Sequence, residues 1–269
     1  MRSFRFVLVL VLIAFAKSAT AQQAATPSPQ ATALLQQALT AVSGGHALTD
    51  VTLSGTARRI AGSDDESGTA VLKALAAGAS RTDLTLPGGN RSEVLNTSST
   101  QPAQPVGAWS GPDGVSHPVV YHNLLTAPAW FFPAFPIANS LSTGYVAIYV
   151  GHETRNGQAV EHLAVSQASA IKASSSALSL AHLSQVDFFL DSTTFLPAAI
   201  TFSIHPDDNA LLDIPVEIDF SNYTTVSGSQ VPFHIQKHIN NSLALDLQFE
   251  SAVLNSGLSV TAFAVGTGL

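Results

Sequence analysis

Regular alternation of apolar and polar residues over the last third of the chain limits what this sequence can fold into. Ile200, Phe202 and Ile204 are separated by single polar residues, and the same period of two recurs in the segments that follow. Such a period places the apolar side chains on one face of a strand. The predicted strands are 186–191, 198–205, 216–223, 230–240 and 243–254. Short turns between them predict an antiparallel meander with one solvated face and one face that covers a core or a cavity.

The earlier part of the chain combines one helix with further strands. Leu35, Ala38 and Val42 share a stripe with a helical period, which predicts an amphipathic helix over 31–42. Prolines interrupt the apolar segment 121–139, which predicts short helical turns there. Period-two segments predict strands at 51–57, 68–75, 80–86 and 91–95 and a hairpin of 144–153 with 159–166. A loop is predicted at 96–106, and the segment 166–184, rich in alanine and serine, is predicted to form either a loop or a poorly ordered helix.

Two motifs lie in the strand-rich third of the chain. The run DFFLDSTTFLP at 187–197 has the spacing aromatic-x-Asp-x-x-Thr-x-x-Pro at a strand and turn. The run SNYTTVSGSQVPF at 221–233 has a tyrosine, a glycine and a proline where one strand returns as the next. In this order, after an N-terminal helix and with a helical insertion midway, the motifs resemble the LolA/LolB-like lipoprotein-carrier superfamily. The resemblance is to a generic periplasmic member and not to the dedicated carrier.

The resemblance covers roughly residues 31–254. It implies an α+β, mainly antiparallel β fold, in which an incomplete, curved β-barrel is covered by an N-terminal helix and a short helical insertion. It also implies an apolar cavity that can accept acyl chains, without implying that this chain carries lipoproteins.

The first 21 residues have the pattern of a secretory signal peptide. A basic start precedes an apolar run over 6–16 and a small-x-small site that ends at Ala21. The apolar run is about half as long as the roughly 20 residues that cross a bilayer, which favours cleavage over anchoring. After cleavage near Ala21 we expect a flexible tail over 22–30 and a single domain over 31–269. The mature protein is then periplasmic or secreted and does not span the membrane.

Charge and composition narrow the classes of partner. Arg2, Arg5 and Lys17 lie in the predicted signal, so eight of the 11 basic residues remain in the mature chain against 18 acidic ones, a net charge near −10. An acidic surface repels phosphate backbones, so nucleic acid is not an expected partner. The chain has no cysteine, which excludes disulfides and thiol catalysis. Its 46% hydrophobic content indicates either an extensive core or an exposed apolar surface that has a function.

An acyl-binding cavity requires a concave apolar surface and a segment that covers it. Such a protein would bind a lipid, an acyl chain or a lipoprotein, with an envelope protein as another possible partner, and would need no cofactor and no catalysis. The alternative is a structural or protein-interaction domain whose core the same side chains fill. The candidate ligand-binding residues are Phe202, Ile218, Phe220, Ile235, Leu245 and Leu247 on strands, and Leu124, Trp130, Phe131, Phe132 and Phe135 on the proline-broken segment.

Histidines and acidic residues provide weaker signals for chemistry. His234 and His238 share a predicted strand face, and His152 and His162 lie on either side of an Asn-Gly turn. A zinc site needs three or four converging ligands, and only pairs can be assembled, so no metal site is predicted. The acidic run 64–66 is predicted to carry solvated turn charges.

Signals for nucleophilic catalysis are equally weak. The sequence has no G-x-S-x-G motif. The neighbouring pairs Ser116 with His117 and His182 with Ser184 have no partnering aspartate at a readable spacing. No catalytic residue is therefore assigned, and a hydrolase with a dispersed site is kept as a third hypothesis.

Overall fold

The computed structural model describes residues 27–97, 104–126, 129–168 and 175–264 of the 269-residue chain. Over these residues the chain forms one sheet of 13 antiparallel strands with few helices. The strands are β1 (Asp50–Ala61), β2 (Asp64–Leu75), β3 (Ser80–Leu86), β4 (Gly89–Thr97), β5 (Pro105–Ser110), β6 (Ser116–Pro118), β7 (Tyr145–Arg155), β8 (Gln158–Gln167), β9 (Val186–Asp191), β10 (Pro197–Ile204), β11 (Ile214–Val226), β12 (Ser229–Ile239) and β13 (Ser242–Leu254). The helices are α1 (Pro29–Ser43), η1 (Tyr121–Leu124), α2 (Ala134–Ser140), α3 (Ser175–Leu183) and η2 (Val260–Phe263).

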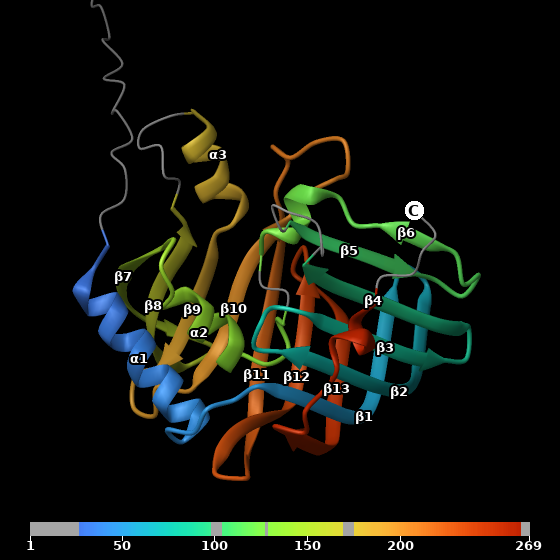
Figure 1. Cartoon of the computed structure of the whole chain (residues 1–269), viewed down its shortest axis with the longest axis horizontal. Coiled ribbons are helices and arrows are strands. Elements are labelled where there is room, and N and C mark those ends of the chain that lie inside the picture. The colour runs from blue at the N-terminus through green and yellow to red at the C-terminus, as the bar shows by residue number, and fades with distance from the viewer. Residues whose placement is uncertain (1–26, 98–103, 127–128, 169–174, 265–269) are drawn as a thin grey trace, which may run out of the picture.

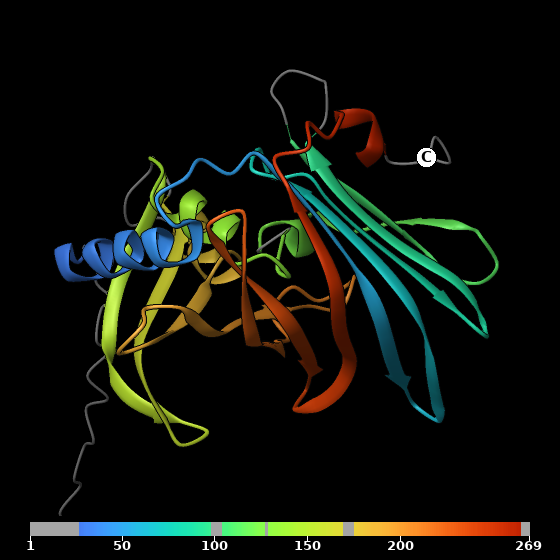
Figure 2. The same cartoon turned by 90° about the horizontal axis from the view of Figure 1, so that it is seen from below.

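The strands lie side by side in chain order, with a single exception. From one edge the sheet runs from β6 back to β1, and from there it continues through β13 back to β7 at the other edge. The first and last strands therefore pair in the middle of the sheet. The sheet curls strongly around its concave face and stays open between its edge strands β6 and β7 (Figures 1 and 2). This confirms the predicted fold class, an incomplete and curved antiparallel barrel with a few covering helices.

A β-bulge shapes the seam between β1 and β13. The register of the two strands shifts between Ser54 and Gly55. A Cβ atom on Gly55 would overlap the carbonyl oxygen of Gln248 and lie 2.6 Å from the Cα atom of Phe249. The two backbones therefore approach too closely for any side chain, and the bulge increases the local twist that bends the sheet.

The concave face of the sheet carries the core. Leu53 lies opposite Leu72, and Phe220 lies opposite Ile235, which in turn lies opposite Leu247. All five side chains are buried in one apolar cluster. The register thus aligns the apolar face of each strand with that of its neighbour, which confirms the period-two prediction for the C-terminal strands.

Helix α1 covers one end of the concave face. The hydroxyl of Ser28 accepts a hydrogen bond from the backbone N–H of Ala31, and Pro29 occupies the first turn, where its missing N–H costs nothing. Gly44 ends the helix in the left-handed conformation, with φ of 61°. Leu35 and the other buried residues of its stripe face α2, β7 and β12 (Figure 2).

The N-terminal predictions are only partly covered by the described residues. The predicted signal peptide over 1–21 and most of the predicted tail over 22–30 lie outside them. Helix α1 begins at Pro29, two residues before the predicted start, because the cap at Ser28 precedes it. None of the helices in the described residues combines the length and the apolar character that crossing a membrane requires.

The proline-broken segment connects the two edges of the sheet. It forms the short helices η1 and α2, as predicted, and η1 contacts β5 while α2 contacts β7 and α1. Phe131, Phe132 and Phe135 on this segment are buried, and the last two rings meet edge to face at 4.9 Å. The segment therefore packs into the concave interior and spans the open side of the barrel.

One prediction for the acidic run 64–66 is wrong. These residues belong to β2 and do not form a turn. The guanidinium of Arg58 donates two hydrogen bonds to Asp65 across the hairpin, at 2.8 and 2.6 Å. Cross-strand pairing of opposite charges lets the strand continue through a polar sequence.

Asp50 fastens the chain that follows β13 to the start of β1. Its carboxylate is buried and accepts hydrogen bonds from the N–H and hydroxyl of Ser256, from the N–H of Gly257 and from the hydroxyl of Thr49, at 2.7–3.0 Å. Burial raises the pKa of Asp50, but these hydrogen bonds outweigh it and hold the pKa below its ordinary value.

We expect Asp50→Asn to lower the free energy of unfolding at pH 7 by about 1–3 kcal/mol, because the new amide NH₂ would face an N–H donor. The folded pKa is lowered, so this stabilisation is present above the unfolded pKa of about 4 and is lost as the pH falls through the folded pKa. The difference from the unchanged protein should therefore shrink in urea unfolding at pH 3. Asp208→Asn, on an exposed loop, is the control. An equal loss at pH 7 and pH 3 would contradict this account.

Candidate ligand-binding cavity

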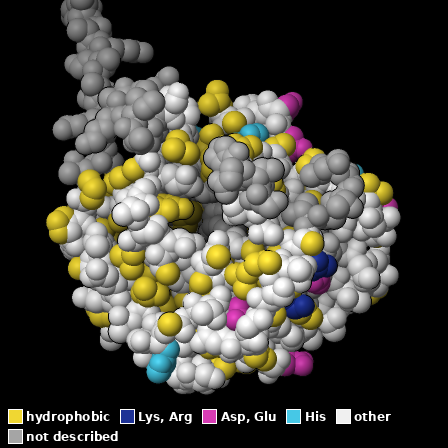
Figure 3. Space-filling model, viewed as in Figure 1, with side chains coloured by type: hydrophobic (Ala, Val, Ile, Leu, Met, Phe, Trp, Pro, Cys, Tyr) yellow, Lys and Arg dark blue, Asp and Glu magenta, His cyan; other side chains and the backbone are white. Residues whose placement is uncertain are grey.

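An open cavity of about 510 Å³ lies on the concave face, where the β1–β2 and β12–β13 hairpins meet the ends of β3 to β5. A second cavity of about 200 Å³ adjoins it and shares Glu93, Trp109, Trp130 and Lys237 with it. Figure 3 shows the hollowed face of the molecule, with hydrophobic side chains around the hollow and charged side chains grouped to one side. Together the two cavities reach the size of pockets that hold small apolar ligands.

Two tryptophans border both cavities. Trp130 comes from the proline-broken segment, is 4% exposed, and meets the ring of Phe131 edge to face at 5.5 Å. Trp109 comes from the end of β5, is 47% exposed and stacks on His117 of β6 at 4.4 Å. The cavity therefore has one rigid aromatic wall and one that faces solvent.

The predicted ligand-binding residues divide between core and cavities. Trp130 and Leu245 line the cavity of about 510 Å³, Phe202 joins Trp130 in the second, and Leu124 lines a separate cavity of about 280 Å³. The others are buried, and Phe220 also borders a hollow of about 270 Å³. The residues that pack in the core are Phe131, Phe132, Phe135, Ile218, Phe220, Ile235 and Leu247. A role for any of them in ligand binding stays a prediction.

The structure adds charged residues that the sequence analysis did not select. The pairing register places Lys237 opposite Ile218 on one side and Leu245 on the other, and Leu245 opposite Arg59, which faces Glu66. This row crosses five strands on the concave face, so two basic side chains enter the cavity. The sequence could have predicted this position. Lys237 lies two residues after Ile235 on the same strand, so both side chains point to the concave face.

The charges of the row are unevenly paired. Glu66 accepts a 2.6 Å hydrogen bond from the N–H of Gly88, and its carboxylate lies 3.0 Å from Arg91 and 3.9 Å from Arg59. The ammonium of Lys237 lies 4.8 Å from the centre of the Trp130 ring, and no described residue forms an ion pair with it. A cation in a largely apolar wall thus has an indole face as its partner.

The histidine pairs of the sequence are not brought together as ligands. His152 pairs with Glu161 at 2.9 Å and His162 with Asp187 at 2.9 Å. His234 similarly lies 3.1 Å from Asp246, and a bulge between positions 237 and 238 displaces His238 from its register. Each imidazole therefore faces a carboxylate of a neighbouring strand.

The candidate catalytic pairs have structural roles. His117 stacks on Trp109, and the hydroxyl of Ser184 is buried, donating to the carbonyl of Leu180 at 2.6 Å and accepting from the N–H of Gln167 at 2.9 Å. Ser184 is therefore sealed away from any substrate.

One serine, histidine and aspartate do converge. The hydroxyl of Ser221 is 3.0 Å from Nδ1 of His234, whose Nε2 is 3.1 Å from Asp246. These side chains lie on the outer face of the sheet, opposite the cavity, and Asp246 also accepts a hydrogen bond from Gln236 at 2.8 Å. The arrangement is a polar ladder across three strands that also has the residue types of a hydrolytic relay.

Comparisons with known proteins place the fold. No protein-family model and no curated protein matches the sequence. Among solved structures, the chain is similar to a putative outer membrane lipoprotein-sorting protein domain from Vibrio parahaemolyticus, with 13% identity, a TM-score of 0.54 and coverage of 87% of this chain and 96% of the other. A DUF1329 family protein from Desulfovibrio piger is 9% identical, with a TM-score of 0.56 and coverage of 89% and 98%.

A LolA superfamily protein from Nitrosomonas europaea is 12% identical, with a TM-score of 0.53 over 89% of this chain and 98% of the other. These likenesses run through nearly the whole length of each neighbour. They confirm, at the level of the fold, the resemblance drawn from the sequence motifs. The chain therefore has a LolA-like fold.

Proposed function

We propose that this is an exported, non-enzymatic protein that binds an amphiphile, a lipid or lipoprotein acyl chain with an anionic end, in the cavity beside Trp130. The observation that carries the proposal is the position of Lys237, which lies beside the indole ring of Trp130 in a mainly apolar cavity and forms no ion pair with a described residue. The description of the Vibrio neighbour as a lipoprotein-sorting domain supports acyl chains as the apolar part.

The apolar wall supplies the free energy of binding. Leu84, Ile239 and Leu245 line the large cavity together with the two tryptophans. Each CH₂ group removed from water contributes about 0.8 kcal/mol before the cost of ordering the chain. About ten buried methylene groups would therefore correspond to micromolar affinity before that cost is subtracted.

The basic residues supply the choice of head group. Three of the 11 basic residues, Arg59, Arg91 and Lys237, line this single cavity of an acidic protein. Glu66 balances the two arginines, and Glu93 lines the cavity without an ion pair to Lys237. The side chain of Lys237 is half-buried, and a charge that is partly removed from water costs free energy unless it is paired. A carboxylate or phosphate at the end of an acyl chain would give Lys237 that partner.

The proposed location follows from the signal-like N-terminus. Cleavage near Ala21 would release the acidic domain into the periplasm or outside the cell, without a membrane span. There its expected partners are lipid or lipoprotein acyl chains, with an envelope protein as a further candidate. Nucleic acid does not fit a net charge of −7 for the whole chain.

The alternative function is a structural or interaction domain with a filled core. The tight packing of Phe131, Phe135 and their neighbours at one end of the concave face favours it there. The two functions differ in whether the cavity beside Trp130 takes up a ligand.

We expect Lys237→Met to weaken the binding of palmitate about tenfold, and to leave the binding of 1-hexadecanol unchanged, because only palmitate has a charged end. Calorimetric titration of the purified protein with each probe measures both affinities. Lys73→Met is the matched control, since Lys73 lies on the outer face of β2. Equal binding of both probes by the variant and the unchanged protein would contradict the role of Lys237. Binding of neither probe, with no lipid found by native mass spectrometry, would contradict ligand binding altogether and favour the filled domain.

A hydrolytic function is the second candidate, because Ser221, His234 and Asp246 converge. We expect the protein to leave p-nitrophenyl butyrate unhydrolysed above the level of free imidazole, since the three residues lie on the outer face of the sheet, where Ser221 borders the hollow of about 270 Å³ but His234 and Asp246 do not. Ser221→Ala should change neither this background nor the thermal midpoint by more than a few degrees. Hydrolysis that Ser221→Ala abolishes would establish an esterase and overturn the non-enzymatic proposal.

A further inference from the structure

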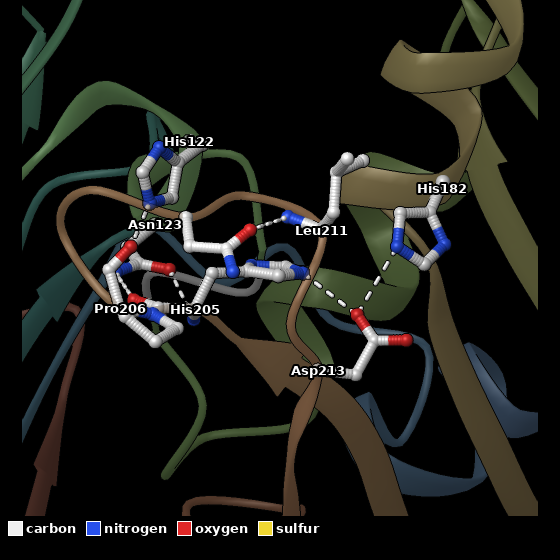
Figure 4. Close-up of polar contacts among 8 residues, drawn as sticks. His122, Asn123, His182, His205, Pro206, Leu211 and Asp213 are labelled. Carbon is white, nitrogen blue, oxygen red and sulfur yellow. Dashed lines mark hydrogen bonds and ion pairs between the residues drawn. The ribbon is translucent and has the colours of Figure 1, made fainter.

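Three side chains that are distant in sequence converge beside the β10–β11 loop. His182 lies in the last turn of α3, His205 follows β10 and Asp213 precedes β11. Nε2 of His205 is 2.9 Å from Oδ1 of Asp213, and Nε2 of His182 is 3.1 Å from the same oxygen (Figure 4). One donor atom from each residue thus lies within 4.8 Å of the other two.

The loop holds His205 in a fixed position. The side-chain amide of Asn123, from η1, accepts a hydrogen bond from the N–H of His205 at 2.9 Å and donates one to its carbonyl at 2.8 Å. The ring of His122 meets the ring of His205 edge to face at 5.7 Å, and the side chain of His205 is 1% exposed. The central ligand is therefore preorganised before any ion binds.

The spacing of the donor atoms fits a small divalent ion. Bonds of about 2.0–2.2 Å in a tetrahedral site separate the ligand atoms by roughly 3.3–3.5 Å. The two nitrogen–oxygen separations of 2.9 and 3.1 Å need to widen by only a few tenths of an ångström. The two imidazole nitrogens, which lie within 4.8 Å of each other, must reach the same separation, and the half-exposed ring of His182 has room to move. His182 and Asp213 are 46% and 47% exposed, so solvent reaches the open side and water can supply a fourth ligand.

The ligand chemistry selects among ions. Two imidazole nitrogens and one carboxylate oxygen suit Zn²⁺ and its neighbours in the first transition row. Magnesium and calcium require oxygen ligands and do not match this set. We propose that His182, His205 and Asp213 form a binding site for a divalent transition-metal ion, Zn²⁺ in the first place, which fastens α3 to the β10–β11 loop.

The surroundings of His205 set the strength of binding. Its second ring nitrogen, Nδ1, is buried, and no described residue provides a hydrogen-bond partner for it. A metal-bound imidazole usually donates this proton to an acceptor, and loss of that acceptor lowers metal affinity about 10- to 100-fold. The site therefore binds zinc in the micromolar range, weaker than a closed structural site.

The rival account is that the three side chains only hydrogen-bond to one another and hold α3 against the loop without a metal ion. In that case both imidazoles donate an Nε2–H to Asp213, and adding metal changes nothing. A direct binding measurement distinguishes the two accounts, because side chains that only hydrogen-bond to one another would not bind one zinc ion per chain. The accounts also differ in the effect of a cysteine at position 182, which keeps a zinc ligand but loses the imidazole donor.

The test uses the full chain, purified without a histidine tag and stripped with EDTA, in calorimetric titrations with ZnCl₂. The expected result is one zinc per chain with micromolar affinity, a higher thermal midpoint with zinc, and no response to MgCl₂ or CaCl₂. His182→Ala should weaken zinc binding at least tenfold, and His182→Cys should restore it. His182 is half exposed, so both variants should fold, and their thermal midpoints in EDTA verify this.

His152→Ala is the matched control, because His152 is an exposed histidine that also pairs with a carboxylate, away from the site. It should bind zinc as the unchanged protein does. Absence of stoichiometric zinc binding by the unchanged protein, or equal binding by His182→Ala, would overturn the proposal. Equal loss in His152→Ala would also overturn it, by placing the zinc elsewhere.

Discussion

The hydrogen-bonded seam between β1 and β13 is the constraint on which the rest of the fold depends. It pairs Val51 with Leu254, near opposite ends of the described chain, and so joins β2 to β6 and β7 to β12 into one sheet. Without it, each half would expose a long edge of unpaired backbone groups. Closing so long a loop carries an entropic cost and slows folding. The close approach at Gly55 and the buried hydrogen bonds of Asp50 reinforce the seam at two points.

The curved sheet has two ends with different contents. Near α1 and α2 the concave face is filled by aromatic and aliphatic side chains such as Phe131 and Leu35. Near the β1–β2 and β12–β13 hairpins, the same face carries Arg59, Glu66 and Lys237, which cannot pack as tightly as apolar groups and leave a cavity. A filled core and a ligand site are therefore compatible in one domain, because each occupies a different part of the sheet.

Sequence reasoning identified the strands and the fold class because alternation fixes which residues face inward. It could not place side chains whose position depends on pairing between distant strands. The row from Ile218 through Lys237 to Glu66 requires the β1–β13 register, which no local pattern contains. His182 and Asp213 likewise meet only after α3 packs near the β10–β11 loop. Asp65 was misassigned because the loop-like composition around it hides a cross-strand ion pair with Arg58.

The break in the barrel lies between β6 and β7, which are consecutive in the chain. A single covalent segment, with η1, Trp130 and α2, spans it, and no ladder joins these two strands in the described sheet. Swinging this segment outward would disturb aromatic packing but would leave the hydrogen bonds between strands intact. The opening is therefore closed by side-chain packing and by the chain itself. Phe131, Phe132 and Phe135 are buried in the main core, so the same rings that close the opening also contribute to the stability of the whole sheet.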